Sequence, residues 1–281
     1  MSFAGMTFAP FRLTMLRSLS MHPILTRYGS FFLYSFTVVM IVGIAAGLGI
    51  TAWRARRLMM NKTSDWLDTF LAALVIGSIG GRAGFVWLEW GYFQERPYEI
   101  LQIWRGGLTY HGALLAGLLG GWAWCVWRKR SFLRDADLMA PSLALVSAFG
   151  WLACWLDGCG YGREAPAGAF LAASLPDNLG IVAWRYQTQL LGAGLSLLVF
   201  ALALVGARRW PGGQFYFVLF ALSLGRAGLG FWRGDTAVLI GAIRIDTLLD
   251  TALALLSLIL LQYSHMKKTK SSIINRQSYE T

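Results

Sequence analysis

Charged and ionisable side chains interrupt several long apolar stretches of this sequence. Arg82 lies in one such stretch, Arg226 lies in another, and Arg233 follows shortly after the second. His111 begins a third stretch, inside the glycine-flanked segment 106–112. Guanidinium groups bind phosphate through planar, forked hydrogen bonds, and histidine can accept a proton near neutral pH. These residue types favour a site that holds a phosphate-bearing ligand beside a proton acceptor.

Other polar residues recur at the ends of neighbouring apolar stretches. Tyr34 and Gln189 each stand near the start of a stretch, whereas Asp157 and Arg163 follow the end of another, in the segment 150–163. If these stretches cross a membrane in alternating directions, all of the polar residues reach the same depth. We therefore expect them to form one site beneath one membrane surface.

Structural roles also account for each of these residues when it is considered alone. Arg82 and Arg226 could extend to lipid headgroups, and Tyr34 could belong to an aromatic belt at the membrane interface. His111 could be a hydrogen-bonded residue at a helix start, and Gln189 could simply pack between helices. It is the convergence at one depth that favours a shared site.

The composition indicates a membrane protein. Hydrophobic residues make up 56% of the chain and charged residues 14%, whereas soluble domains carry about 25% charged residues. So few charges cannot cover a soluble core of this size. The formal net charge of +11 sits in short basic runs between apolar stretches, which favours anionic membrane lipids as partners and argues against nucleic acid.

Seven stretches approach the length of a membrane-spanning helix, which needs about 20 mostly apolar residues. Small residues are frequent within them and allow close helix packing in lipid. We predict an all-α, polytopic integral membrane protein with about seven transmembrane helices. The predicted spans are 31–52, 66–88, 108–127, 138–156, 186–205, 214–231 and 240–261.

The distribution of Lys and Arg predicts the orientation of the chain. Basic residues concentrate in the loops 53–65, 128–137 and 206–213 and in the C-terminal tail. Cytoplasmic loops carry this excess, so the N-terminus is predicted outside and the C-terminus in the cytoplasm. The predicted divisions are an N-terminal extracytoplasmic or interfacial segment (1–30), a seven-helix transmembrane domain (31–262) and a cytoplasmic polar tail (263–281).

The three cysteines, Cys125, Cys154 and Cys159, are too few for a disulfide scaffold. Cys154 and Cys159 stand five residues apart, a spacing that does not share one helix face. Glycines around Cys159 indicate that the helix ends there, so a disulfide across the turn is possible. Packing of the two small side chains is the favoured alternative. No metal site is expected, because no partner ligands follow zinc spacing.

Over roughly residues 22–250, these motifs resemble the prolipoprotein diacylglyceryl transferase family. The most specific match is the segment 99–112, which is similar to the family pattern E-I-x-x-x-W-x-G-G-x-x-x-H-G and places His111 on the functional histidine. Tyr34 falls on the family's tyrosine. The segment 231–235 is similar to the family's F-R-x-P-D with one shifted residue, so Arg233 falls on the lipid-phosphate arginine.

Further motifs support the resemblance. The segment 81–84 looks like the family's second-span arginine motif and contains Arg82. Asp137, followed by Ala140 and Pro141, also fits, as does the segment 188–190 with Gln189. Gly158, Gly162 and Arg163 match the diagnostic family segment G-R-x-G-N-F-x-N-G-E-x-x-G-R.

The same diagnostic segment also contains the main departures from the family. Trp151 stands in place of the arginine, Cys154 and Asp157 replace the two asparagines, and Cys159 replaces the glutamate. Divergent relatives carry a cysteine-containing version of this segment, and this chain resembles them more closely here. A later family glutamate is also absent, with Gly192 following the segment 188–191.

The resemblance implies a multi-pass enzyme of the bacterial cytoplasmic (inner) membrane. Its partners would be membrane lipids, phosphatidylglycerol as donor, and a prolipoprotein signal peptide whose lipobox cysteine thiol accepts the diacylglyceryl group. His111 would accept a proton or orient the headgroup, and Arg233 and Arg226 would hold the phosphate. The catalytic candidates are His111, Arg233 and Tyr34. The substrate-binding candidates are Arg82, Arg226, Arg163, Asp157, Gln189 and Gly112.

Two other classes of function stay open at this point. The replacements at Trp151 and Cys159 motivate a divergent paralogue that binds or modifies another lipid without prolipoprotein transferase activity. A transporter or channel would place inverted repeats, interrupted spans and charges at the membrane midplane, whereas the charges here lie near one surface. The transferase is the leading hypothesis, and it requires no metal or organic cofactor.

Overall fold

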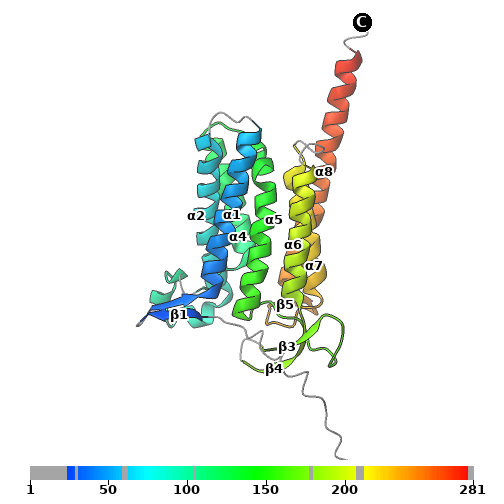
Figure 1. The fold of residues 1–281 in the computed structure, drawn as a ribbon. Helices are drawn as coiled ribbons and strands as arrows, with labels where there is room; N and C mark the ends of the chain where they lie inside the picture. The colour runs from blue at the N-terminus through cyan, green and yellow to red at the C-terminus, as the bar shows by residue number, and fades with distance from the viewer. Residues whose placement is uncertain are drawn as a thin grey trace, which may run out of the picture.

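The computed structural model describes residues 24–28, 31–58, 63–103, 106–176, 180–206 and 212–277. Within these residues, seven long helices run side by side in an up-and-down bundle (Figure 1). A four-residue helix, α3 (Trp90–Phe93), and a 3₁₀ turn, η1 (Pro97–Glu99), follow α2. The seven long helices are α1 (Ser35–Arg57), α2 (Thr63–Leu88), α4 (Tyr110–Trp127), α5 (Phe132–Asp157), α6 (Thr188–Gly206), α7 (Gln214–Gly230) and α8 (Ile245–Gln277).

Five of these helices are long and apolar enough to cross a membrane. They contain the spans Ser35–Arg57, Asp65–Leu88, Phe132–Asp157, Thr188–Gly206 and Ile245–Lys267. Helices α4 and α7 have 18 and 17 residues, respectively, and are not among the five. The chain is therefore a mostly helical integral membrane protein. Each of the seven predicted stretches overlaps one long helix, although the bounds differ.

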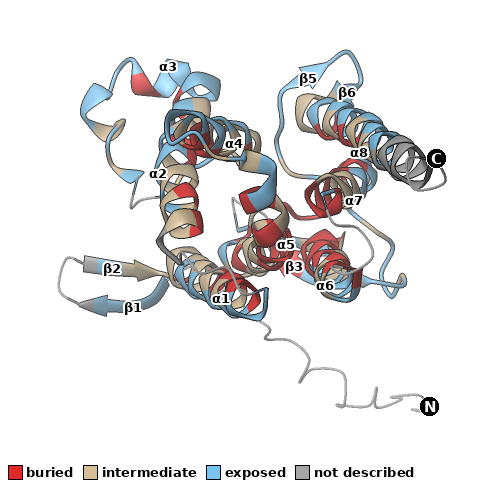
Figure 2. Ribbon diagram, turned by 90° about the horizontal axis from the view of Figure 1, so that it is seen from above, coloured by how far each residue is buried: buried red, intermediate tan, exposed pale blue. Residues whose placement is uncertain are grey.

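The helices pack in pairs, chiefly α2 with α4, α1 with α5, α5 with α6, and α7 with α8. Seen from above, α5 lies between the α1–α2–α4 group and the α6–α7–α8 group (Figure 2). Small residues allow the closest approaches. A Cβ atom at Gly80 of α2 would collide with Ala116 of α4, and one at Gly43 of α1 would collide with Phe149 of α5.

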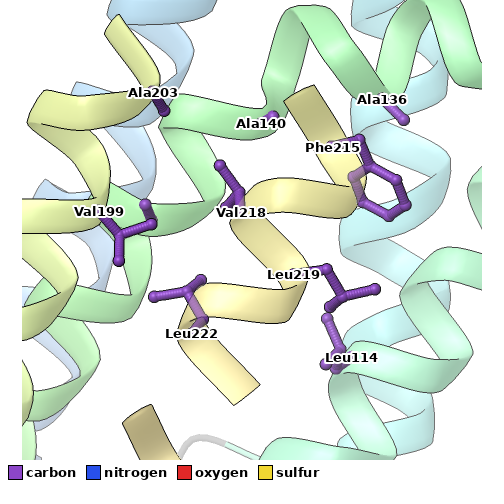
Figure 3. Packing of buried hydrophobic residues seen from close by; sticks show 10 residues of the cluster. Leu114, Ala136, Ala140, Val199, Ala203, Phe215, Val218, Leu219 and Leu222 are labelled. Atoms are coloured by element: carbon purple, nitrogen blue, oxygen red, sulfur yellow. The ribbon is translucent and has the colours of Figure 1, made fainter. Parts of the chain in front are cut away.

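Helix α7 contributes the centre of the main buried cluster (Figure 3). Val218 and Leu222 of α7 face Val199 of α6, while Leu219 faces Leu114 of α4. In lipid, such contacts stabilise helix association mainly through van der Waals packing. These contacts fix the rotation of α7 about its own axis. They therefore also set the direction of the Arg226 side chain, which lies near the C-terminal end of α7. The whole cluster is Leu114, Ala136, Ala140, Ala144, Val199, Ala203, Phe215, Val218, Leu219 and Leu222.

Three two-stranded antiparallel hairpins add to the helices, so the all-α prediction describes the bundle but not its loops. They are β1 (Ile24–Tyr28) with β2 (Phe31–Tyr34), β3 (Ala172–Pro176) with β4 (Val182–Tyr186), and β5 (Leu239–Ile240) with β6 (Ile243–Arg244). Strand β2 takes the first residues of the predicted span 31–52, because its aromatic run favours strand pairing. The first helix consequently begins at Ser35.

The predicted division at residue 262 falls inside a helix. Helix α8 continues to Gln277, since residues 262–277 contain neither Gly nor Pro to end it. Other predicted features lie outside the described residues: residues 1–23 of the N-terminal segment, residues 104–105 of the histidine motif, residues 207–211 of one basic loop, and the end of the tail from residue 278.

Candidate functional site

A buried carboxylate joins three helices near the first turns of α8. Asp250 is 2% exposed. Its Oδ1 lies 2.9 Å from Nε2 of His111 on α4, and its Oδ2 lies 3.4 Å from Nε of Arg226 on α7. The structure thus brings together two residues predicted from the sequence, His111 and Arg226, through a third that we did not predict.

Besides its ion pair with Asp250, the guanidinium of Arg226 contacts two aromatic rings. Its guanidinium carbon lies 3.6 Å from the ring centre of Tyr110 and 5.3 Å from that of Trp151, distances at which rings attract cations. Its Nε is buried without a hydrogen-bond partner. That Nε faces Oδ2 of Asp250, whereas the terminal Nη1 and Nη2 groups make no hydrogen bond among the described residues and stay available to an anion.

Trp151 on α5 and Gly192 on α6 are sterically complementary. A Cβ atom at Gly192 on α6 would collide with the indole ring of Trp151 on α5. Trp151 is buried, and the space beside the glycine accommodates its ring. Two of the positions where this chain departs from the family pattern are therefore spatial neighbours, and together they place an aromatic surface beside Arg226.

Arg233, the other predicted phosphate-binding arginine, is already paired with carboxylates. It donates to both oxygens of Asp235, at 2.9 and 2.5 Å, and to Asp246 at 2.9 Å. Burial lowers the pKa of Arg233, but the hydrogen bond and charge of Asp235 and the charges of Asp246 and Asp250 outweigh it, so the pKa lies above its ordinary value. Arg244 joins the same network through Asp235 and Asp246.

The two arginine sites meet on one face of α8. Asp246 and Asp250 are four residues apart, so their side chains lie one helical turn from each other. Asp246 forms an ion pair with Arg233, which follows α7, and Asp250 forms an ion pair with Arg226 within α7. The Arg233 network stabilises the junction of α7 and α8 that holds Arg226 in place.

Arg82 clamps a loop. Its guanidinium donates to the backbone carbonyls of Glu99, Ile100, Gly106 and Gly107. It also lies 5.1 Å from the ring centre of Phe93. These contacts hold the segment that leads into His111. A cavity of about 380 Å³ adjoins Arg82 and is lined by Glu89 and Glu99 rather than by His111 or Arg226.

The segment after α5 is closed by a disulfide between Cys154 and Cys159. Our preference for simple packing of these cysteines is therefore wrong. Helix α5 ends at Gly158, whose φ of 85° turns the chain back and brings the two residues together. Gln189 lies behind this turn, fully buried, and donates to the carbonyl of Cys159. It thus anchors the turn.

The remaining candidates lie around this group. Arg163 has an exposed side chain, while its backbone N–H donates to the carbonyl of Trp232, next to Arg233. Asp157 is exposed at the end of α5, and Tyr34 precedes the first residue of α1. Gly112 lies where α4 touches α2, and a Cβ atom there would collide with the Gly80 carbonyl. No recorded contact among the described residues joins these four to His111.

Asp250 had a signal in the sequence. It lies inside the predicted span 240–261, and a carboxylate within a span is expensive and usually functional. The prediction from sequence assigned arginines to the phosphate and His111 to the proton or the headgroup, and it did not include the carboxylate that balances them. Trp151 stood out in the sequence only as a departure from the family pattern, and nothing there indicated that its ring lies beside Arg226.

These features define a helical membrane protein with a buried histidine–carboxylate pair beside an arginine able to bind an anion. A family model for prolipoprotein diacylglyceryl transferase matches residues 23–263. The chain therefore belongs to the prolipoprotein diacylglyceryl transferase family.

Curated relatives agree with this family over most of their length. A protein of Bacillus licheniformis is 29% identical over 255 residues, covering 88% of this chain and 94% of its own. One of Symbiobacterium thermophilum is 32% identical, with coverage of 78% and 85%. One of Bacillus velezensis is 32% identical, with coverage of 81% and 87%. Each is named phosphatidylglycerol–prolipoprotein diacylglyceryl transferase.

Proposed function

We propose that this chain transfers a diacylglyceryl group from phosphatidylglycerol to the lipobox cysteine thiol of a prolipoprotein. Family membership and the names of the relatives support the reaction. The observation that carries the assignment to this site is Arg226, whose side chain is 13% exposed, whose terminal Nη donors make no hydrogen bond among the described residues, and which lies beside the His111–Asp250 pair. The divergent-paralogue alternative is not favoured by these relatives.

Arg226 binds the phosphate of the lipid donor. The thiol proton of the acceptor cysteine passes to His111, and the thiolate forms a bond to the glyceryl carbon that carries the phosphate ester. The carbon–oxygen bond breaks, and its electron pair leaves with glycerol phosphate. The leaving phosphate thereby gains one negative charge, which a guanidinium stabilises more in the transition state than in the bound donor.

The other predicted site residues position this pair. Arg82 holds the loop before His111, and Gln189 holds the turn after α5. Arg233 stabilises the α7–α8 junction through Asp235 and Asp246. Arg163 is exposed beside Arg233 and makes the first contact with an approaching headgroup. Roles for Tyr34, Asp157 and Gly112 in binding substrate stay predictions.

We further propose that all seven long helices cross the cytoplasmic membrane of a bacterium, with the N-terminus outside. The basic residues Arg54, Arg56 and Arg57 lie in the last turn of α1, and α1 ends at the end of the bundle opposite to the start of α8 (Figure 1). This distribution agrees with the positive-inside rule. The disulfide Cys154–Cys159 belongs to the other end. Disulfides persist in oxidising compartments, which supports placing that end outside the cytoplasm.

The reaction is tested with the purified full-length chain, phosphatidylglycerol vesicles and a lipobox peptide, analysed by mass spectrometry. We expect the peptide to gain the mass of one diacylglyceryl group. A matched peptide with serine in place of the lipobox cysteine should gain nothing, because a serine hydroxyl does not ionise near neutral pH. Absence of any mass gain on the cysteine peptide, with folded protein that still retains lipid, would favour the divergent paralogue.

A further inference from the structure

Asp250 is the carboxylate at the centre of the site, and its two oxygens have different partners. Oδ1 faces Nε2 of His111 and Oδ2 faces Nε of Arg226. An ionised carboxylate accepts hydrogen bonds and donates none. A histidine facing it therefore places its N–H at Nε2, and the lone pair of the neutral ring is left at Nδ1.

We propose that Asp250 is a positioning residue that fixes this tautomer and makes Nδ1 of His111 the atom that accepts the thiol proton. This inference rests on the proposed transfer reaction. The substrate supplies the nucleophile and the protein supplies the histidine and the carboxylate, so a three-part relay of thiol, imidazole and carboxylate forms only when the acceptor cysteine is present. The same division of roles operates in hydrolases whose nucleophile is their own serine.

The charges of the site are consistent with this role. Before substrate binds, Arg226 is the cation that balances Asp250. When Arg226 also pairs with the lipid phosphate, it neutralises the Asp250 carboxylate less completely. A second cation beside the carboxylate is then stabilised. Proton transfer from the thiol converts His111 to an imidazolium, which supplies that cation at 2.9 Å from Oδ1. Phosphate binding and thiol deprotonation therefore favour each other.

Few other groups near His111 are placed to orient its imidazole ring. Tyr110 stacks edge-on against the imidazole, with ring centres 5.2 Å apart. Arg226 approaches from α7, and Arg233 acts on Asp250 electrostatically from beyond α7. Among these groups, Asp250 is the one that contacts a ring nitrogen of His111 and so orients the imidazole.

The test compares Asp250→Asn and Asp250→Glu with the unchanged chain. The amide keeps the size of the carboxylate but loses its charge, so we expect kcat to fall roughly 10²- to 10⁴-fold, the range that a positioned acid–base group contributes. The KM for phosphatidylglycerol should stay within about threefold, because Arg226 remains. Asp250→Glu keeps the charge and should recover part of kcat.

A dependence on pH separates positioning from a merely structural role. A free cysteine thiol ionises near pH 8.5, so at about pH 9.5 most acceptor thiol needs no base. We expect the defect of Asp250→Asn and of His111→Ala to shrink at least tenfold between pH 7 and pH 9.5, whereas that of Arg226→Gln does not. Thr251→Val, on the next residue of α8, is the control for damage to the helix.

The outcomes distinguish the two levels of the proposal. If Asp250→Asn turns over within threefold of the unchanged chain, or if its loss is the same at both pH values, the positioning role is wrong while the transfer reaction stands. If the unchanged chain transfers nothing at either pH, the proposed function itself fails. The midpoint of thermal unfolding of each purified variant in detergent shows which variants are folded.

Discussion

Two buried aspartates, at opposite ends of the bundle, each bind an arginine, yet only one of them forms a candidate reaction site. Asp135, at the start of α5, is 1% exposed and accepts hydrogen bonds from Thr69 at 2.7 Å and Arg130 at 2.7 Å. Arg130 also donates to the backbone carbonyl of Asp65. At the other end, Asp250 is as deeply buried, but its partner Arg226 has no hydrogen bond within the described residues.

The comparison shows that burial and ion pairing do not by themselves identify a functional site. The Asp135 cluster uses its donors and acceptors on the protein, so it stabilises the packing of α2 against the loop between α4 and α5. The Asp250 cluster leaves guanidinium donors unused in a place where an unpaired donor is costly. An anionic substrate would accept hydrogen bonds from these donors. Each prediction below changes one side of this contrast.

The largest effect is expected from Arg226→Gln. Removal of a cation that stabilises developing charge should lower transfer by about 10²- to 10³-fold. Arg130→Gln is the matched control in the Asp135 cluster and should leave transfer per folded molecule within about threefold. Both are measured with the lipobox peptide by mass spectrometry. Equal losses in the two variants would mean that the contrast between the clusters is false.

The opposite pattern is expected from Asp135→Asn. It removes the nearer charge partner of Arg130, whose side chain is 20% exposed and keeps Asp65 at 3.9 Å, so the cost lies below that of a fully buried pair, about 3–5 kcal/mol. We expect a lower midpoint of thermal unfolding with transfer by the folded fraction nearly unchanged. A variant as stable as the unchanged chain but catalytically dead would assign Asp135 to the reaction and contradict our view of it.

An intermediate effect is expected from Gly192→Ala. The new methyl group meets the indole of Trp151, and overpacking of this kind typically costs about 1–3 kcal/mol. Because Trp151 lies against Arg226, we expect transfer to fall about tenfold, in line with that strain. Adding Trp151→Phe should restore part of the activity, since a smaller ring leaves room for the methyl group. Additive losses in the double variant would show that the two positions are not coupled.

The smallest effect on transfer is expected from the double change Cys154→Ser and Cys159→Ser. Closing so short a loop stabilises the folded chain by only about 2 kcal/mol through the entropy of the unfolded state. The turn keeps its hydrogen bonds from Thr188 and Gln189. We expect a lower unfolding midpoint and transfer within about threefold. A complete loss of transfer would instead place the disulfide in the site.

The sequence predicted the helices better than it predicted their contacts. Each predicted span overlaps one long helix of the described residues, and His111 and Arg226, predicted to share a site, both contact Asp250. The sequence could not predict rotation about a helix axis, so Arg82 and Arg226 looked equivalent. In the structure Arg82 binds carbonyls of a loop, whereas Arg226 faces Asp250.

Other features depend on contacts between residues distant in sequence. The complementarity of Trp151 and Gly192 joins α5 and α6 across some forty residues and is visible only when the helices are packed. The pairing of Cys154 with Cys159 depended on where α5 ends, which is set by the left-handed turn at Gly158. The carboxylate Asp250 was visible in the sequence, but its partners on α4 and α7 were not.

The central claim is that Arg226 binds the lipid phosphate and Arg233 does not. It is tested most directly by native mass spectrometry of phosphatidylglycerol retained by purified Arg226→Gln and Arg233→Gln, with diacylglycerol, which lacks the phosphate, as the control lipid. We predict that Arg226→Gln loses phosphatidylglycerol but keeps diacylglycerol, while folded Arg233→Gln keeps both. Retention of phosphatidylglycerol by Arg226→Gln, with its selective loss from Arg233→Gln, would contradict the account.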